Sequence, residues 1–163
     1  MATSASAHVH MILEAEGVPA SPVTGALKAL GEVETRWTQG TGSGNVDRIY
    51  MRERSALGAG ATDSYNLLAA GSLEDIHGQA IDADELKALY LIPTSGSIRL
   101  EAPAATILPI FNDATDVLNV PSFGLMFNWG AAGLTIGTDG SFDVTETTGA
   151  ATADYTLVFI CAQ

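Results

Sequence analysis

Three glycines spaced two residues apart, Gly40, Gly42 and Gly44, form the stretch of this sequence that most resembles a ligand-binding loop. Glycine-rich loops hold phosphate groups when a helix follows them, because the helix N-terminus supplies unpaired N–H groups. A P-loop also needs a lysine after its last glycine, and a dinucleotide fingerprint needs the spacing G-x-G-x-x-G. The sequence has neither feature here, and the residues after Gly44 alternate as strand residues do. We therefore predict a turn between two strands.

Histidine and cysteine residues give no stronger site. His8 and His10 would share one face of a strand and could chelate a metal ion, but no third ligand is placed beside them. Their role stays open, and we predict no metal-binding residues. His77 lies in the turn-like segment EDIHGQ, and Cys161, in the apolar run TLVFICAQ, reads as a core thiol rather than a nucleophile.

Carboxylates and serines are the other candidate catalytic groups. Asp82, Asp84 and Glu85 lie close together, and a pair of acids is what glycoside hydrolysis requires. Adjacent acids are more often a solvated turn or the first turn of a helix. No serine lies in a G-x-S-x-G motif. We predict that the protein is not an enzyme, and we assign no catalytic residue, no cofactor-binding residue and no cofactor.

Basic residues are few, and three of them alternate along one predicted strand: Arg48, Arg52 and Arg54. They could bind phosphate, but the formal net charge is −12, and so acidic a chain is repelled by nucleic acids and anionic membranes. We therefore expect neither partner. The arginines are expected to pair with acids of a neighbouring strand or of another subunit.

Length and composition favour one domain that packs against other copies. The chain has 163 residues, of which 16% are charged, below the usual quarter, and small residues make up the difference. Its mean hydropathy is +0.21, which suits a chain with surface hidden at interfaces. The sequence shows neither a signal-peptide pattern nor an apolar run of about 18 residues, so we expect no membrane-spanning helix.

Strand signals dominate the pattern along the chain. HVHMILEAEG alternates as a short strand, VPASPVTG reads as an extended connector, and ALKALGEVETRWTQ fits a helix in its first half and a strand in its second. ELKALYLIP predicts a buried strand that has Leu86, Ala88, Tyr90 and Ile92 on one face and that ends at Pro93. Asp139-Gly140 predicts a tight hairpin between LTIGT and SFDVT.

These signals predict an all-β protein, an antiparallel β-sandwich or jelly-roll-like barrel with an extended N-terminal arm. We place a strand, arm and connector in residues 1–34 and the β-sandwich domain in residues 35–163. The arm would reach onto a neighbouring subunit.

The segment from Arg36 to Leu91 resembles a group of small virion proteins of tailed bacteriophages. The matching parts are Trp37, the glycine-rich stretch from Gly40 to Asp47, Arg54, LLAAGSLEDIHGQAI and ELKALYL, and the later GLTIGTDG and ADYTLVFICA also fit that pattern. Asn66 stands where the pattern prefers Asp, and Ala69-Ala70 is one residue longer than the pattern. Residues 1–34 have no counterpart in it.

The resemblance implies a structural protein located in the virion, on the capsid or tail surface, and made in the host cytoplasm. The leading hypothesis is a capsid decoration or cement protein that binds the major capsid protein or other virion proteins and forms a homo-oligomer, with a trimer as the first candidate. The alternative is a head-fibre or tail accessory protein whose sandwich binds a host glycan or receptor. In that case Trp37, Trp129, Tyr50 and Tyr65 would be the residues that stack on sugars.

Overall fold

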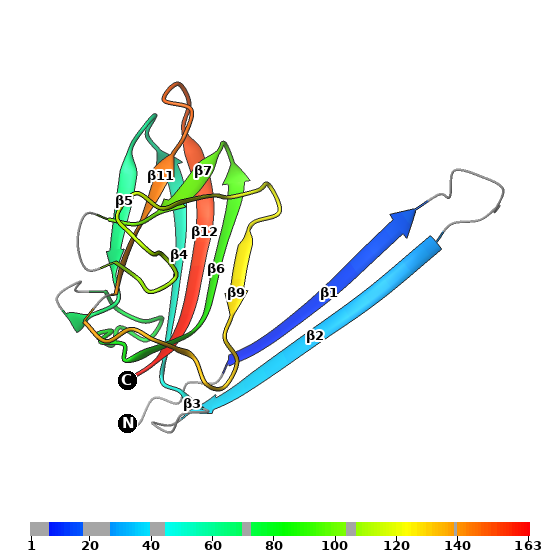
Figure 1. Ribbon diagram of the computed structural model, residues 1–163, viewed down its shortest axis with the longest axis vertical. Helices are drawn as coiled ribbons and strands as arrows, with labels where there is room; N and C mark the ends of the chain where they lie inside the picture. Colours follow the sequence, from blue (N-terminus) through cyan, green and yellow to red (C-terminus); the bar gives the residue numbers. More distant parts are fainter. Residues whose placement is uncertain (1–6, 18–26, 40–44, 70–72, 104–106, 139) are drawn as a thin grey trace.

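The protein is all-β, as predicted, and consists of a β-sandwich with a long hairpin that projects from one end (Figure 1). This computed structural model describes residues 7–17, 27–39, 45–69, 73–103, 107–138 and 140–163, with the backbone alone for the first two ranges. The glycine stretch from Gly40 to Gly44 and the connector VPASPVTG lie outside the described residues.

One sheet of the sandwich, which we call the β12 sheet, is built around the last strand of the chain. Its strands in spatial order are β4 (Arg48–Leu57), β12 (Ala153–Ala162) and β6 (Glu85–Ser95), followed by β9 (Leu125–Asn128) and β10 (Leu134–Thr135), which both pair with β6. All these pairs are antiparallel. Because β12 has a neighbour on each side, the C-terminal residues form the middle of the sheet.

The facing sheet, which we call the β11 sheet, is also antiparallel. Its strands in spatial order are β5 (Thr62–Asn66), β11 (Ser141–Glu146), β7 (Ile98–Glu101) and β8 (Val117–Asn119). Figure 1 shows the two sheets layered against each other, with the C-terminus at the end from which the hairpin leaves.

The projecting hairpin, which we call the arm, consists of β1 (Ala7–Gly17) and β2 (Leu27–Gln39). The two strands pair from end to end, Ala7 opposite Trp37 and Gly17 opposite Leu27. The strand predicted for HVHMILEAEG is confirmed, and the ambiguous second segment is a strand along its whole length. The predicted boundary at residue 34 falls inside β2, so the arm ends later, at Gln39.

A short strand attaches the arm to the sandwich. β3 (Asn45–Val46) pairs in parallel with the end of β2, with Asn45 opposite Thr38. The N–H of Asp47, the next residue, donates to the carbonyl of Cys161 on β12. The chain thus passes from the arm directly into the β12 sheet.

Alternating residues of both sheets form the core between them. From the β12 sheet it contains Tyr50, Leu89, Leu91, Leu157 and Phe159, and from the β11 sheet Tyr65, Ile98, Leu100, Phe142 and Val144. The Tyr50 ring stacks on Phe159 with a centroid distance of 4.6 Å and meets Tyr65 of the other sheet edge to face at 6.2 Å. These aromatic contacts join the two sheets.

A polar network closes the side of the sandwich between β4 and β5. The Asp63 carboxylate accepts hydrogen bonds from Arg54 Nε and from the Tyr155 hydroxyl, both at 2.7 Å, and Arg52 Nη2 lies 3.7 Å away. The Tyr155 hydroxyl also bonds that of Tyr65 at 2.6 Å, and burial raises the pKa of both tyrosines. The predicted pairing of Arg52 and Arg54 with an acid of a neighbouring strand is confirmed.

Two details predicted for β6 are wrong. The strand does not end at Pro93 but continues to Ser95, and Pro93 lies beside a register shift, a position at which strands tolerate proline. A second register shift, between Ile160 and Cys161 of β12, reverses the alternation of β6 side chains between the two faces of the sheet. Leu86 therefore joins the core, whereas Ala88 and Tyr90 belong to a separate cluster on the opposite face.

The hairpin predicted at Asp139-Gly140 is also wrong. β10, on one side of the turn signal, pairs with β6 of the β12 sheet, whereas β11 pairs with β5 and β7 of the β11 sheet. The N–H of Ile136 donates to the carbonyl of Asp84, which extends the attachment of β10 to the first sheet. The segment after it crosses from one sheet to the other instead of turning back.

At the end of the sandwich away from the arm, Glu146 joins two loops. Its carboxylate accepts N–H groups from Gly60 of the β4–β5 loop at 2.7 Å and from Gly149 of the β11–β12 loop at 2.9 Å. Thr148 donates both its N–H and its hydroxyl. These hydrogen bonds, the Thr148 hydroxyl above all, lower the pKa of Glu146 to about 2.

The lowered pKa of Glu146 predicts a loss of stability in acid. Because its pKa falls from 4.5 to about 2 on folding, its contribution is complete above pH 4.5 and is lost as the pH falls toward 2. Glu146→Gln should therefore lower the free energy of unfolding at neutral pH and have much less effect near pH 2, as measured by urea unfolding. Glu53→Gln, at an exposed carboxylate on β4, should change neither value. An effect of Glu146→Gln that does not vary with pH would contradict this account.

The backbone is strained at one described non-glycine residue, Ala56, which has φ of 53° next to a register shift in β12. Its N–H donates to the Asp154 carboxylate at 2.6 Å, which holds the chain in this conformation. Ala56→Gly should raise the free energy of unfolding by about 0.5–1 kcal/mol, because glycine adopts positive φ without a steric cost. In a denaturant titration, Ala61→Gly should instead be destabilising, since Ala61 is not at positive φ. Equal effects of the two substitutions would rule out strain at Ala56.

Candidate interaction surface

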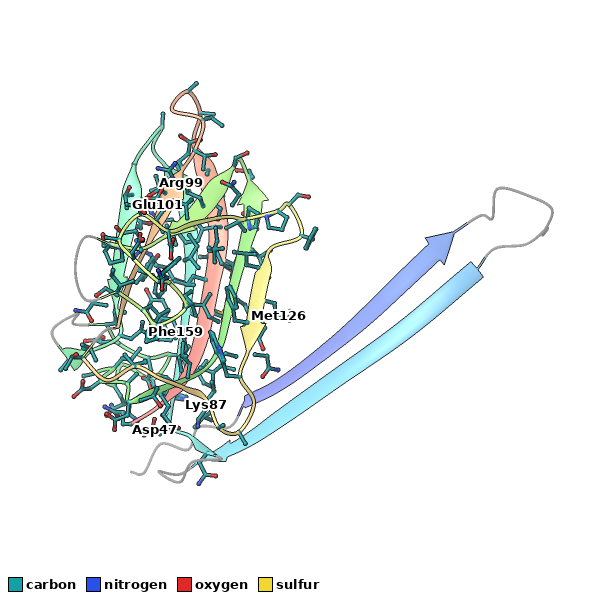
Figure 2. All side chains as sticks on the ribbon, in the orientation of Figure 1. Asp47, Lys87, Arg99, Glu101, Met126 and Phe159 are labelled. Atoms are coloured by element: carbon teal, nitrogen blue, oxygen red, sulfur yellow. The ribbon has the colours of Figure 1, made fainter. Side chains whose placement is uncertain are left out.

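The outer face of the β11 sheet is polar, as a solvent-facing sheet should be. Its cross-strand rows contain Thr62, Thr145 and Arg99, and next to them Ser64, Asp143 and Glu101. Arg99 and Glu101 form an ion pair (Figure 2), and the Thr145 hydroxyl donates to Glu101 at 3.3 Å. Val117 of β8, opposite Glu101, is an exposed apolar residue on this otherwise polar face.

The outer face of the β12 sheet has an apolar row in its middle, next to a row that contains Glu53, Thr156 and Ile92. Met51, Val158, Tyr90 and Met126 lie in one cross-strand row over β4, β12, β6 and β9. Met51 is 53% exposed and Met126 46%, and Ile92, in the next row of that face, is 41% exposed. We call these five residues the outer patch. Large apolar side chains gathered on one face of a sheet mark an interaction surface.

The outer patch continues into buried structure at the base of the arm. Val46 of β3 forms a buried cluster with Ala88, Tyr90 and Ile160, separate from the core, and Val158 packs against it. The Tyr90 hydroxyl is buried without a hydrogen-bond partner among the described residues, and burial raises its pKa to about 12. One end of this face is therefore covered within the chain, and the other end is open.

The loop before β9 extends the apolar surface beyond the sheet. Phe123 is 85% exposed, and the next residue, Gly124, has φ of 89° and lies directly against β6. A Cβ at Gly124 would come within 2.8 Å of the Leu91 carbonyl oxygen, so a glycine is required for this close approach. The loop thus holds an exposed aromatic residue beside the outer patch.

The pairing register divides the arm into two unlike faces. One face carries Ala7, Val9, Met11, Leu13 and Ala15, opposite Trp37, Thr35, Val33, Gly31 and Ala29. The other carries His8, His10, Ile12, Glu14 and Glu16, opposite Arg36, Glu34, Glu32, Leu30 and Lys28. All charged residues of the paired strands are on the second face. An isolated two-stranded hairpin is marginally stable in water, so its apolar face requires cover.

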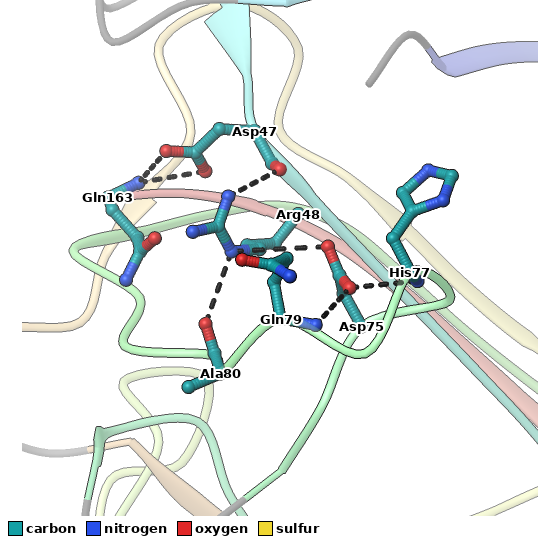
Figure 3. Close-up of polar contacts among 7 residues, drawn as sticks. All are labelled: Asp47, Arg48, Asp75, His77, Gln79, Ala80 and Gln163. Carbon is teal, nitrogen blue, oxygen red and sulfur yellow. Dashed lines mark hydrogen bonds and ion pairs between the residues drawn. The ribbon is translucent and has the colours of Figure 1, made fainter. Parts of the chain in front are cut away.

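Hydrogen bonds fix the point at which the arm joins the sandwich (Figure 3). The Asp47 carboxylate accepts the N–H of Gln163 at 3.2 Å, and Arg48 Nη1 donates to the Asp47 carbonyl at 2.9 Å. Arg48 Nε donates to the Ala80 carbonyl at 3.1 Å and lies 4.0 Å from the buried carboxylate of Asp75. The first residues of β4, the C-terminus and the 74–80 turn are thereby tied together.

The pairing register places an acid on the strand face that carries His8 and His10. His8 and His10 share one face of β1, where their register partners are Arg36 and Glu34. His77 is exposed in the turn, and its N–H donates to Asp75 at 2.8 Å. Among the described residues, no three side chains of His, Cys, Asp or Glu are grouped so that they could hold a metal ion.

Two of the three acids have structural partners, and the cysteine is buried. Asp82 accepts the N–H of Ala69 at 2.9 Å, and the Glu85 carboxylate pairs with Lys87. Lys87 is fully buried and also donates to the Ala131 carbonyl at 2.8 Å, which fastens the β9–β10 loop to β6. Cys161 is buried in the core, and burial raises the pKa of its thiol, which disfavours the reactive thiolate.

The aromatic residues weighed for sugar stacking are mostly in the core. Tyr50 and Tyr65 are 8% and 1% exposed. Trp129 stacks on Phe127 at 5.6 Å, and both rings pack against the core. Trp37 is on the apolar face of the arm by register. Packing in or against the core thus accounts for Tyr50, Tyr65 and Trp129.

No family model, curated protein or solved structure matches the chain. Within the described residues there is also no helix of the length and apolar character needed to cross a membrane.

The junction beneath the arm can be tested through Arg48. Arg48→Ala removes the cation beside buried Asp75 and the donor to Ala80, so the free energy of unfolding should fall by about 1–2 kcal/mol. Arg48→Lys should recover part of this loss, because it restores the charge without the guanidinium geometry. Denaturant titration of both variants gives the comparison. Unchanged stability of Arg48→Ala would show that the junction holds without it.

Proposed function

We propose that this protein is a structural subunit of a tailed-phage virion, and specifically a decoration or cement protein that binds and stabilises the capsid. The observation that carries the proposal is the combination of an apolar outer patch with an arm that has one apolar face. A protein that works by packing against other subunits needs surfaces of this kind. The resemblance of residues 36–91 to small virion proteins supports the same role.

The partners in this proposal are other copies of the chain and the major capsid protein or another virion protein. The net charge of −12 disfavours contact with packaged nucleic acid, so the subunit would act on the outer surface of the particle. Buried Lys87 and the Asp63 network make the sandwich a rigid body, and the arm provides reach.

Quantitative mass spectrometry of particles purified from the virus that encodes this chain tests the role. A decoration protein should be present at a copy number comparable to that of the major capsid protein. Particles stripped of it should disassemble at a lower temperature and recover when the purified chain is added back. A copy number far below that of the capsid protein would favour the head-fibre or tail alternative, and absence from particles would refute the virion role.

A further inference from the structure

We infer that the outer patch of one copy is covered by the apolar face of the arm from a second copy. This inference assigns a partner to the surface used in the proposed function and takes its biological setting from that function. The contact itself is a property of the isolated chain. It joins two surfaces that are each incomplete: a sheet face with exposed Met51, Ile92 and Met126, and a hairpin without a second layer.

Charge placement favours the arm as the occupant of the outer patch. If the arm lies on the patch with its Val9, Met11 and Val33 face, its charged residues remain on the opposite, solvent side. No charge of the arm is then buried, which removes one penalty of such a contact. Glu53, the charged residue in the Ile92 row of the sandwich, lies on the edge strand β4, at the margin of the contact. Sheet-on-sheet packing of this kind also accommodates a twisted two-stranded ribbon.

The size of the arm matches what a stable dimer needs. β1 has 11 residues, which span about 37 Å, and two strands are about 10 Å wide. One face of the arm thus covers about 350 Å² of a sheet. If two copies exchange arms, two such contacts bury about 1,400 Å² in total, counting both surfaces of each, within the range of specific interfaces.

The direction of the arm favours a second copy over the arm's own sandwich. Figure 1 shows β1 and β2 diverging from the β12 sheet along their length, so the far end of the arm lies well beyond its own sandwich. Met126 lies on the side of the sandwich toward which the arm extends (Figure 2). Two copies related by a two-fold axis would each place an arm on the other's patch, which gives a closed assembly.

Paired substitutions in the full-length chain test both surfaces, with sedimentation velocity and light scattering as the readout. On the arm, Met11→Glu lies on the apolar face and Ile12→Glu, one residue further, on the charged face. On the sandwich, Met126→Glu lies in the outer patch, whereas Val117→Glu introduces the same charge at a 45% exposed position of β8 in the β11 sheet. Near-UV circular dichroism reports whether each sandwich is folded.

The wild-type chain should have the mass of two or more copies. Met11→Glu and Met126→Glu should each weaken association at least about tenfold, and Ile12→Glu and Val117→Glu should leave it unchanged. A monomeric wild-type chain would overturn the inference, and so would equal effects within either pair. If the wild type is monomeric but Met11→Glu and Met126→Glu still lower its thermal stability, the arm covers its own sandwich instead.

The two proposals fail separately. Association that depends on Met11 and Met126 in a chain absent from virus particles would retain the arm contact and refute the virion role. Abundant incorporation into particles of a chain whose isolated form is monomeric would retain the virion role and refute the arm contact.

Discussion

The structure depends on the position of β12 between β4 and β6, because this strand is apolar on both faces. Tyr155, Leu157 and Phe159 enter the core, whereas Val158 and Ile160 lie on the outside. The facing sheet covers one side of this strand and keeps water from it. The other side is also apolar, so it requires an apolar neighbour too. Among the side chains that the structure describes, Val46 meets that requirement at one end only. The uncovered part of this sheet face is the surface available for assembly.

The two ends of the sandwich serve different purposes. At one end, Glu146 and the network around Asp63 use buried hydrogen bonds to hold loops and sheet edges, and these interactions are complete within one chain. At the other end, the Asp47–Arg48 junction fixes the arm to the sheet without covering the outer patch. The sandwich is therefore held together by interactions within one chain. Its exposed large apolar side chains gather at the outer patch and at Phe123, and others lie elsewhere, at Ile76, Val117 and Leu118. One face of the arm is also apolar by register.

Strand alternation was sufficient to predict the all-β class, the strand at β1 and the pairing of Arg52 and Arg54 with an acid, because each depends on local pattern or charge. The partner of β10 could not be predicted this way, since a two-residue strand has no pattern and Asp139-Gly140 is a local turn signal. The register shift between Ile160 and Cys161 skips Lys87 of β6, so Leu86 joins the core although Ala88 lies on the outer face. Strict alternation along β6 could not predict this. The sequence does carry a sign of the outer patch. Leu125, Met126 and Phe127 are consecutive apolar residues, which indicates a strand apolar on both faces. Sequence alone does not say what covers the second face.

The central claim is that the arm of one copy covers the outer patch of another, and methionine methyl groups report on it directly. The chain has 4 methionines, and Met51 and Met126 are in the patch. Chains carrying carbon-13 methionine methyls would be mixed with unlabelled chains, and isotope-filtered NOE spectra would select contacts between copies. The account predicts intermolecular NOEs from the Met51 and Met126 methyls to arm protons of the unlabelled copies. NOEs to the arm within the same chain only, or none to any arm, would contradict it.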